Sequence, residues 1–148
     1  ANSFGVGKAG ISSIRLSSLS RGDIELVYGG EEVVLEVLIE VSEDIVSPLV
    51  GFLVKNRLGI ELFGDNNLTL EKEIAALAAG TTATITFSFK WPLLVAGSYA
   101  ITAAIADGTL EGHQQQHWVH DMLVVEVAHQ RREVGLFNLE NITFEMTQ

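Results

Sequence analysis

The sequence lacks cysteine, is poor in proline and contains no long apolar run. Without cysteine the chain forms neither disulfides nor thiolate metal sites, which is compatible with a reducing compartment. No apolar stretch approaches the ~18 residues of a membrane-spanning helix, and the first residues show no signal-peptide pattern. A chain of 148 residues can bury ~70% of its unfolded surface in one core, so we expect a single domain over residues 1–148.

Basic residues are also scarce. Nine Lys and Arg stand against nineteen Asp and Glu, which gives a net charge of −10 at neutral pH. A chain with this charge repels nucleic acid and anionic lipid, and its one basic pair is Arg131-Arg132. We therefore expect a neutral ligand or another protein as partner, and no nucleic acid.

Alternation of apolar and polar residues predicts most of the fold. Residues 32–41 form the clearest run, and residues 82–90 and 97–107 alternate in the same way. Shorter runs at 11–19, 24–28 and 122–127, together with the hairpin and tail strands described below, bring the count to nine or ten strands. Glycine-bearing turns separate them, and this pattern predicts an all-β antiparallel sandwich. The expected core consists of Val33, Leu35, Val37, Ile39, Ile85, Phe87, Phe89, Tyr99, Ile101 and Ile105.

Residues 48–67 predict a hairpin at the centre of the fold. An apolar run at 49–54 meets a polar break at 55–57, and Gly59 then allows a turn. A second run at 60–63 ends in Gly64-Asp65-Asn66-Asn67. The pattern indicates two strands joined by a turn of four or five residues, with an architectural role.

Three segments are less regular. Residues 68–79 have helical spacing with Asn67 as a possible cap, but a single turn or an irregular crossover between sheets fits equally well. Residues 134–139 and 142–146 predict two tail strands after a charged break. Residues 1–10 are glycine-rich and resemble a linker.

One face of the strand at 97–107 carries only small residues, namely Ser98, Ala100, Thr102, Ala104 and Ala106. Such a face is either plain solvent surface or the floor of a shallow groove, where side chains must stay low.

The segment 111–121 is rich in His and Gln, and three interpretations stay open. His113, His117 and His120 could bind a metal, although their spacing lacks the helical zinc pattern. Alternatively, Trp118 offers an apolar plate to a sugar ring, with His117, His120 and Gln115 as hydroxyl partners. The third interpretation is a solvated loop that Trp118 anchors to the core.

Catalysis has little support in the sequence. There is no nucleophile elbow and no cysteine. The acidic pairs Glu31-Glu32 and Glu43-Asp44 fall at strand or loop edges, where solvated charge is typical. Asp65-Asn66-Asn67 has the composition of a calcium site, but turn chemistry explains it as well. We expect a protein that is not an enzyme and uses no cofactor or metal.

An ordered set of landmarks over residues 3–127 resembles the C-terminal domain of Wzt, the ATP-binding subunit of the O-antigen ABC transporter. The set begins with Ser3-Phe4-Gly5 and Gly7 and continues with V-G-F-L-V-K-N-x-x-G-x-x-L-F-G-x-N at 50–66. It ends with Gly80, Leu93-Leu94, Gly97-Ser98-Tyr99, His117-Trp118 and Asp121 before a V-x-V strand.

This resemblance implies an immunoglobulin-like β-sandwich that binds O-antigen polysaccharide for export. It also implies a homodimer that exchanges a C-terminal strand within residues 130–148. The chain would then be a fragment whose missing nucleotide-binding domain works with a transmembrane subunit, at the cytoplasmic face of the inner membrane. The expected sugar contacts are Trp118, His117, His120, Gln115, Ser98 and Thr102.

Two other functions remain open. The first is a structural dimerisation domain of a cytoplasmic assembly, with no ligand of its own. The second is a small β-sandwich hydrolase or a metal-dependent enzyme that modifies sugars.

Overall fold

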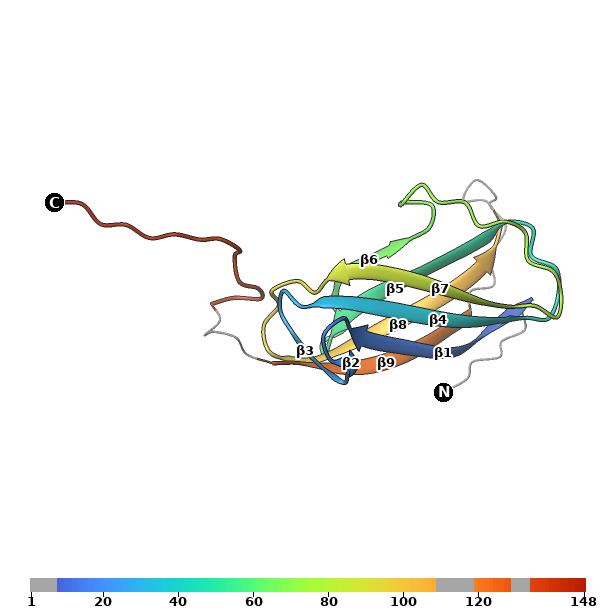
Figure 1. Cartoon of the computed structure of the whole chain (residues 1–148), viewed down its shortest axis with the longest axis horizontal. Helices are drawn as coiled ribbons and strands as arrows, with labels where there is room; N and C mark the ends of the chain where they lie inside the picture. The colour runs from blue at the N-terminus through green and yellow to red at the C-terminus, as the bar shows by residue number, and fades with distance from the viewer. Residues whose placement is uncertain (1–7, 109–118, 129–133) are drawn as a thin grey trace.

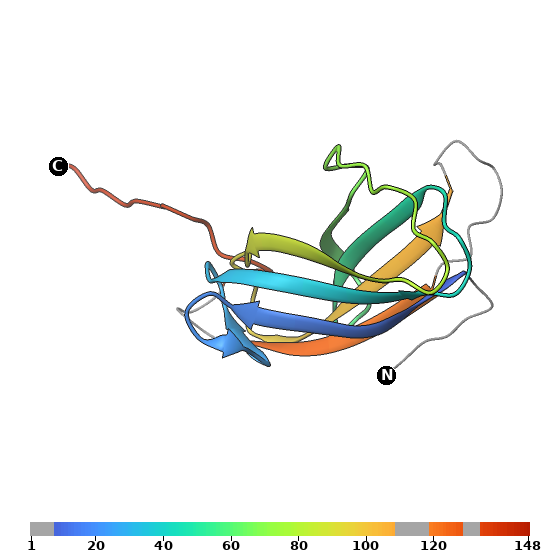
Figure 2. The same ribbon diagram turned by 45° about the vertical axis from the view of Figure 1, so that its right-hand side comes forward.

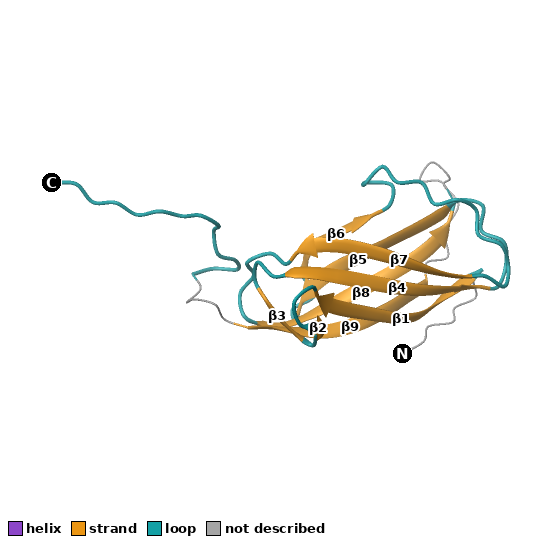
Figure 3. Cartoon of the chain, viewed as in Figure 1, coloured by secondary structure: helices purple, strands orange, loops and turns teal. Residues whose placement is uncertain are grey.

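Two β-sheets face each other in the computed structural model, which describes residues 8–108, 119–128 and 134–148 (Figure 1). The described part contains strands and loops and no helix, and therefore no helix that could cross a membrane (Figure 3). The predicted all-β sandwich is confirmed.

The smaller sheet has the order β2-β1-β4-β7. Its strands are β1 (Ala9–Ser18), β2 (Gly22–Asp23), β4 (Glu32–Val41) and β7 (Thr82–Lys90). All its pairings are antiparallel. β4 and β7 have the bounds that their alternation predicts.

The larger sheet has the order β3-β9-β8-β5-β6. Its strands are β3 (Leu26–Tyr28), β5 (Pro48–Asn56), β6 (Glu61–Asn66), β8 (Gly97–Asp107) and β9 (Val119–Ala128). β3 runs parallel to β9, whereas the other pairs of this sheet are antiparallel. β5 and β6 form the expected hairpin, and Gly59 has a φ of +81° in its turn.

The core lies between the two sheets as predicted. Val33, Leu35, Val37, Ile39, Tyr99, Ile101 and Ile105 are buried, as is Phe87, whereas Ile85 and Phe89 are half-buried and pack against them. An aromatic group fills the side of the sandwich between β6 and β7. Its closest ring pairs are Phe52–Phe87 at 4.9 Å, Phe52–Phe89 at 5.3 Å and Phe63–Trp91 at 5.4 Å.

The segment 68–79 is a crossover between the sheets rather than a helix. A single turn closes where the Glu71 N–H donates to the Leu68 carbonyl at 3.0 Å, and Glu71 then adopts a φ of +56°, which a helix cannot continue. Further on, Ile45 and Leu77 exchange two backbone hydrogen bonds. The backbone of this segment is thus hydrogen-bonded to a distant part of the chain and not within a helix.

The tail does not pair with either sheet of this chain at 134–139 or 142–146, and it projects from one end of the sandwich (Figures 1 and 2). The exchange of a tail strand with a second copy therefore stays a prediction. Phe137 makes an isolated bridge to Leu94, and no neighbouring strand continues it. The linker-like stretch 1–10 is too long, because Ala9 and Gly10 already belong to β1.

Candidate functional site

The candidate site is the outer face of the larger sheet, on the side away from the core. Strand register sets which residues meet there. One row joins Gly64, Leu53, Thr102 and Met122, and the next joins Asn66, Gly51, Ala104 and His120. The small face predicted on β8 thus continues across β5 and β6.

A hollow of about 330 Å³ lies on this face over β5, β6 and β8. Gly51, Thr102 and Ala104 form its floor, and its sides include Leu53, Lys55 and Asn66. Its volume is at the lower end of the ~300–1,000 Å³ typical of small-molecule sites. We call this feature the sheet hollow.

Two glycines keep β5 and β6 close together, and one of them, Gly51, lies on the floor of the hollow. A Cβ atom at Gly51 would lie 2.9 Å from both the Asn66 Cβ and the Asp65 carbonyl oxygen. A Cβ atom at Gly64 would lie 2.2 Å from the Phe52 carbonyl oxygen. Any side chain at these positions would push β6 away from β5, so glycine is required for close approach of the backbones.

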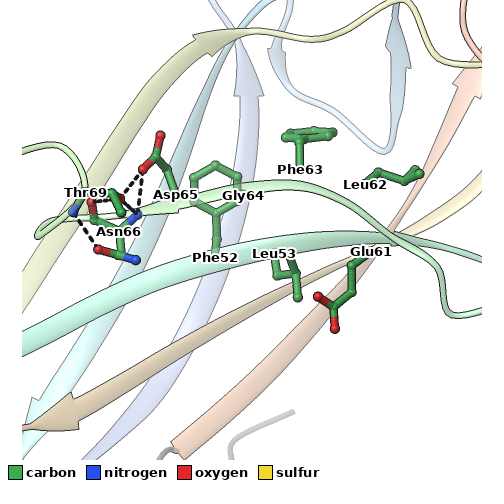
Figure 4. Close-up of a pocket in the computed structure, with 9 residues that line it drawn as sticks. All are labelled: Phe52, Leu53, Glu61, Leu62, Phe63, Gly64, Asp65, Asn66 and Thr69. Atoms are coloured by element: carbon green, nitrogen blue, oxygen red, sulfur yellow. Dashed lines mark hydrogen bonds between the residues drawn. The ribbon is translucent and has the colours of Figure 1, made fainter. Parts of the chain in front are cut away.

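A tight polar turn follows β6. Figure 4 shows it among the residues that line a second hollow along the β6 edge. The Asp65 carboxylate accepts bonds from the Asn66 N–H, at 3.1 Å, and from the Thr69 hydroxyl, while the Asn66 carbonyl oxygen Oδ1 accepts the Thr69 N–H at 2.9 Å. This second hollow has a volume of about 420 Å³. Asp65 and Asn66 therefore serve turn chemistry, as the simpler reading of this cluster predicts.

Asn67 fixes the turn to the sheet. Its side chain is buried, accepts the Val50 N–H at 2.8 Å, and donates to the carbonyls of Pro48 at 3.2 Å and Lys72 at 3.1 Å. These bonds replace ladder bonds that β6 no longer makes beyond Asn66. Because Asn67 is fixed in this way, the neighbouring Asn66 is also held in place beside the hollow.

Three polar side chains among the residues that line the hollow keep unused hydrogen-bonding capacity. Within the described residues, the Asn66 Nδ2, the Lys55 ammonium and the Thr102 hydroxyl have no hydrogen-bond partner. Away from the hollow, the same face carries exposed Met122 and Val124 on β9.

The predicted site residues have three different outcomes. Thr102 lies on the floor of the hollow, and Ser98 lies on the same face further along β8, where it donates to the Glu126 carboxylate. His120 lies on β9 beside Ala104, although its side chain is outside the described residues. Gln115, His117 and Trp118, and with them His113, are likewise outside. Ala106, expected on the small face, is buried instead.

Sequence reasoning missed Gly51, Lys55 and Asn66 as part of this face. The available signal was the pair of glycines in neighbouring strands of one hairpin, Gly51 and Gly64. Only the register shows that both glycines belong to one surface. The hollow could therefore not be placed from the pattern of β8 alone.

The two carboxylates whose pKa is lowered, Glu31 and Asp107, lie away from the hollow and hold the fold together. Glu31 accepts two bonds from the Arg21 guanidinium, both at 2.8 Å, and one from the Ser18 hydroxyl at 2.7 Å. The Arg21 and Ser18 hydrogen bonds outweigh burial and lower the pKa of Glu31 to about 2. Arg21 also lies 5.1 Å from the centre of the Tyr28 ring. The cluster ties the turn after β1 to β3.

Asp107, at the end of β8, likewise has its carboxylate bound by groups from other parts of the chain. Burial alone would raise the pKa of its carboxyl group, but hydrogen bonds from the Lys8 ammonium and the Ser47 N–H, each 2.9 Å long, lower it. Among the described residues no group of three His, Cys, Asp or Glu could hold a metal.

Comparisons with known proteins agree with this architecture. The chain is similar to the crystal structure of the C-terminal domain of Wzt, with a TM-score of 0.83 and 19% identity over 99% of this chain and 88% of that one. Weaker likenesses are the CARDB domain of the PF1109 protein from Pyrococcus furiosus (TM-score 0.49, 13% identity, 78% and 86% covered) and a β-glucosidase from Listeria innocua (0.44, 15%, 79% and 16%).

The search of curated proteins finds no match. The family model for the Wzt C-terminal domain, in contrast, matches residues 1–139, which is nearly the whole chain. On this evidence the chain belongs to the family of Wzt C-terminal domains.

Proposed function

We propose that this domain binds O-antigen polysaccharide, without catalysis, and so recognises the glycan for export by an ABC transporter. The observation that carries the proposal is the low outer face of the larger sheet. Its floor of Gly51, Thr102 and Ala104 leaves room for a sugar, and Lys55 and Asn66 at its sides supply donors. Family membership supports the transporter role.

The chemistry of the face suits a neutral polymer. Sugar rings bring hydroxyl groups for hydrogen bonds and C–H faces for apolar contacts, and the hollow offers both kinds of surface. Each hydrogen bond contributes only ~0.5–1.5 kcal/mol net in water, so we expect micromolar or weaker affinity. Weak binding suits a module that must later release its cargo.

The rest of the assembly follows from the family. The proposed context is the cytoplasmic side of the inner membrane, with a nucleotide-binding domain in the same subunit and a transmembrane subunit as partners. Trp118, His117, His120 and Gln115 remain proposed as sugar contacts at the rim, and Ser98 and Thr102 as contacts on the sheet itself.

We further propose that two copies form a homodimer through the tail, residues 130–148. The tail exposes more apolar surface than a solvated segment normally carries. Val134 is 90% exposed and Phe144 is 91% exposed, and Leu136, Phe137, Leu139, Ile142 and Met146 are all more than half exposed. Strand exchange with a second copy would cover these side chains. A purely structural dimerisation domain would need only this part of the proposal.

Binding to an array of purified O-polysaccharides tests the function, with the Trp118→Ala and Thr102→Val variants compared at equal stability. We expect the parent to bind at least one polysaccharide and both variants to bind it more weakly. If the parent binds none, the binding function is wrong. If the folded Trp118→Ala variant binds as well as the parent, Trp118 is not a contact.

A further inference from the structure

We propose that the sheet hollow is a subsite for one N-acetylated amino sugar of the glycan, with the acetamido group seated on the floor. This inference rests on the proposed function and names the class of sugar that the site takes.

The size of the hollow argues for one sugar residue rather than a stretch of polymer. Its volume is about 330 Å³, and its floor spans two strands, β5 and β8, at positions where no side chain is larger than that of threonine. The register surrounds this floor with bulkier groups, since Leu53 lies opposite Thr102 and Lys55 lies opposite Ala100. A single ring or ring substituent thus fits between these side chains.

The chemistry of the lining argues for an acetamido group. The floor includes the carbon atoms of Gly51 and Ala104, and Leu53 lies beside them. Burying a methyl group there contributes by the hydrophobic effect, at about 25 cal/mol per Å² of apolar surface removed from water. A ring that carries only hydroxyl groups would leave them against carbon, where burial without a hydrogen bond is unfavourable.

The polar groups around this apolar floor complement an amide. Lys55 and Asn66 each bring a donor that no described residue uses, and an amide carbonyl accepts such donors. The Thr102 hydroxyl, also without a partner among the described residues, can accept the amide N–H. A deoxy-sugar methyl would fill the apolar floor but would leave these donors unpaired, which lowers affinity.

Protein NMR of the whole 148-residue chain tests this assignment. The probes are the methyl glycosides of N-acetylglucosamine, N-acetylgalactosamine, glucosamine, glucose and rhamnose, each added up to tens of millimolar. We expect at least one acetamido sugar to shift the amide signals of Gly51, Thr102 and Ala104, and the other three sugars to bind about tenfold more weakly or not at all.

Two matched variants examine the position of the sugar. Ala104→Leu places a large side chain on the floor and should abolish the shifts, whereas Ala100→Leu adds the same group on the same face outside the hollow and should not. Thr102→Val keeps the shape and removes the hydroxyl, and should weaken binding about two- to tenfold. Spectra of the free variants verify that each remains folded.

Several results would overturn the inference. They are equal binding of glucose and the acetamido sugars, preferential binding of rhamnose, shifts confined to another surface, and no shift with any acetamido sugar. An array in which the parent binds only O-polysaccharides without amino sugars would contradict the inference while leaving the proposed function intact. Binding to no polysaccharide, with acetamido shifts still present at the hollow, would contradict the proposed function alone.

Discussion

Gly64 lies directly over the carbonyl oxygen of Phe52, so that a Cβ atom at position 64 would be only 2.2 Å away from it. The neighbouring atom belongs to the backbone and cannot rotate aside. Gly64→Ala should therefore separate β6 from β5 and lower the free energy of unfolding by ~3 kcal/mol or more, the upper end of the usual cost of overpacking.

Gly59→Ala is the matched control for this change. Gly59 also has an unusual backbone, with φ at +81°, but no atom lies within 4 Å of its added Cβ. Its substitution should cost only the ~1–2 kcal/mol of a left-handed conformation. Urea unfolding of both variants compares the costs, and equal or smaller destabilisation at position 64 would contradict the steric argument.

Phe87 tests the assignment of the core. It is 8% exposed and packs on Phe52 with ring centres 4.9 Å apart. Phe87→Ala should lower the free energy of unfolding by ~3–5 kcal/mol, because it leaves a cavity between the sheets. Ser88→Ala, on the exposed side of the same strand, should change it by less than ~0.5 kcal/mol. A loss below ~1 kcal/mol for Phe87→Ala would show that the site is not packed as described.

Glu31 should make stability depend on acid pH. Its folded pKa is about 2, below the ordinary value of 4.5, because Arg21 and Ser18 bind the ionised form. The resulting stabilisation is fully present above pH 4.5 and is lost as the pH falls towards 2. Glu31→Gln should cost ~1–3 kcal/mol at neutral pH, and the difference from the parent should shrink across that acid range.

Chemical denaturation at a series of pH values measures this effect. Glu32→Gln is the control, since Glu32 is the next acidic residue in the chain and its carboxylate makes no hydrogen bond or ion pair among the described residues. At neutral pH this variant should change the free energy of unfolding by less than ~0.5 kcal/mol. A Glu31→Gln difference that stays constant from neutral to acid pH would rule out the proposed linkage.

Removal of residues 130–148 tests the homodimer. If the tail is exchanged between copies, the truncated protein should become a monomer, or should aggregate through the uncovered strand edges. Light scattering coupled to size exclusion gives the mass of each form. A truncated protein that remains a well-behaved dimer would contradict the proposed exchange.

Sequence patterns predicted the parts of the fold where a strand has one buried face. β4, β7 and β8 alternate along their whole length, so their bounds and core residues could be read directly. The crossover at 68–79 could not be settled, because Asn67 acts through bonds to Val50 and Pro48, which are near only in the folded chain. Apolar and polar residues alternate in the tail as well. A strand also needs a neighbouring strand to pair with, and alternation cannot show whether one is present.

The candidate site was predicted only in part, for a similar reason. Ser98 and Thr102 were visible because the small face of β8 repeats within one strand. Gly51 and Asn66 join that face through the pairing of β5 with β8 and β6, which depends on register. The position of Asn66 beside the hollow depends in turn on the turn at Asn66 and Thr69.

The parallel pairing of β3 with β9 has a consequence for the order in which the molecule assembles. Leu26 meets Glu126, so this contact joins residues 100 positions apart. During synthesis, at ~5–20 residues per second, β3 waits roughly 5–20 s before its partner exists. Such non-local pairing also places folding among the slower classes, on the order of milliseconds to seconds. We therefore expect β3, the short strand at one edge of the larger sheet, to be among the last strands to pair.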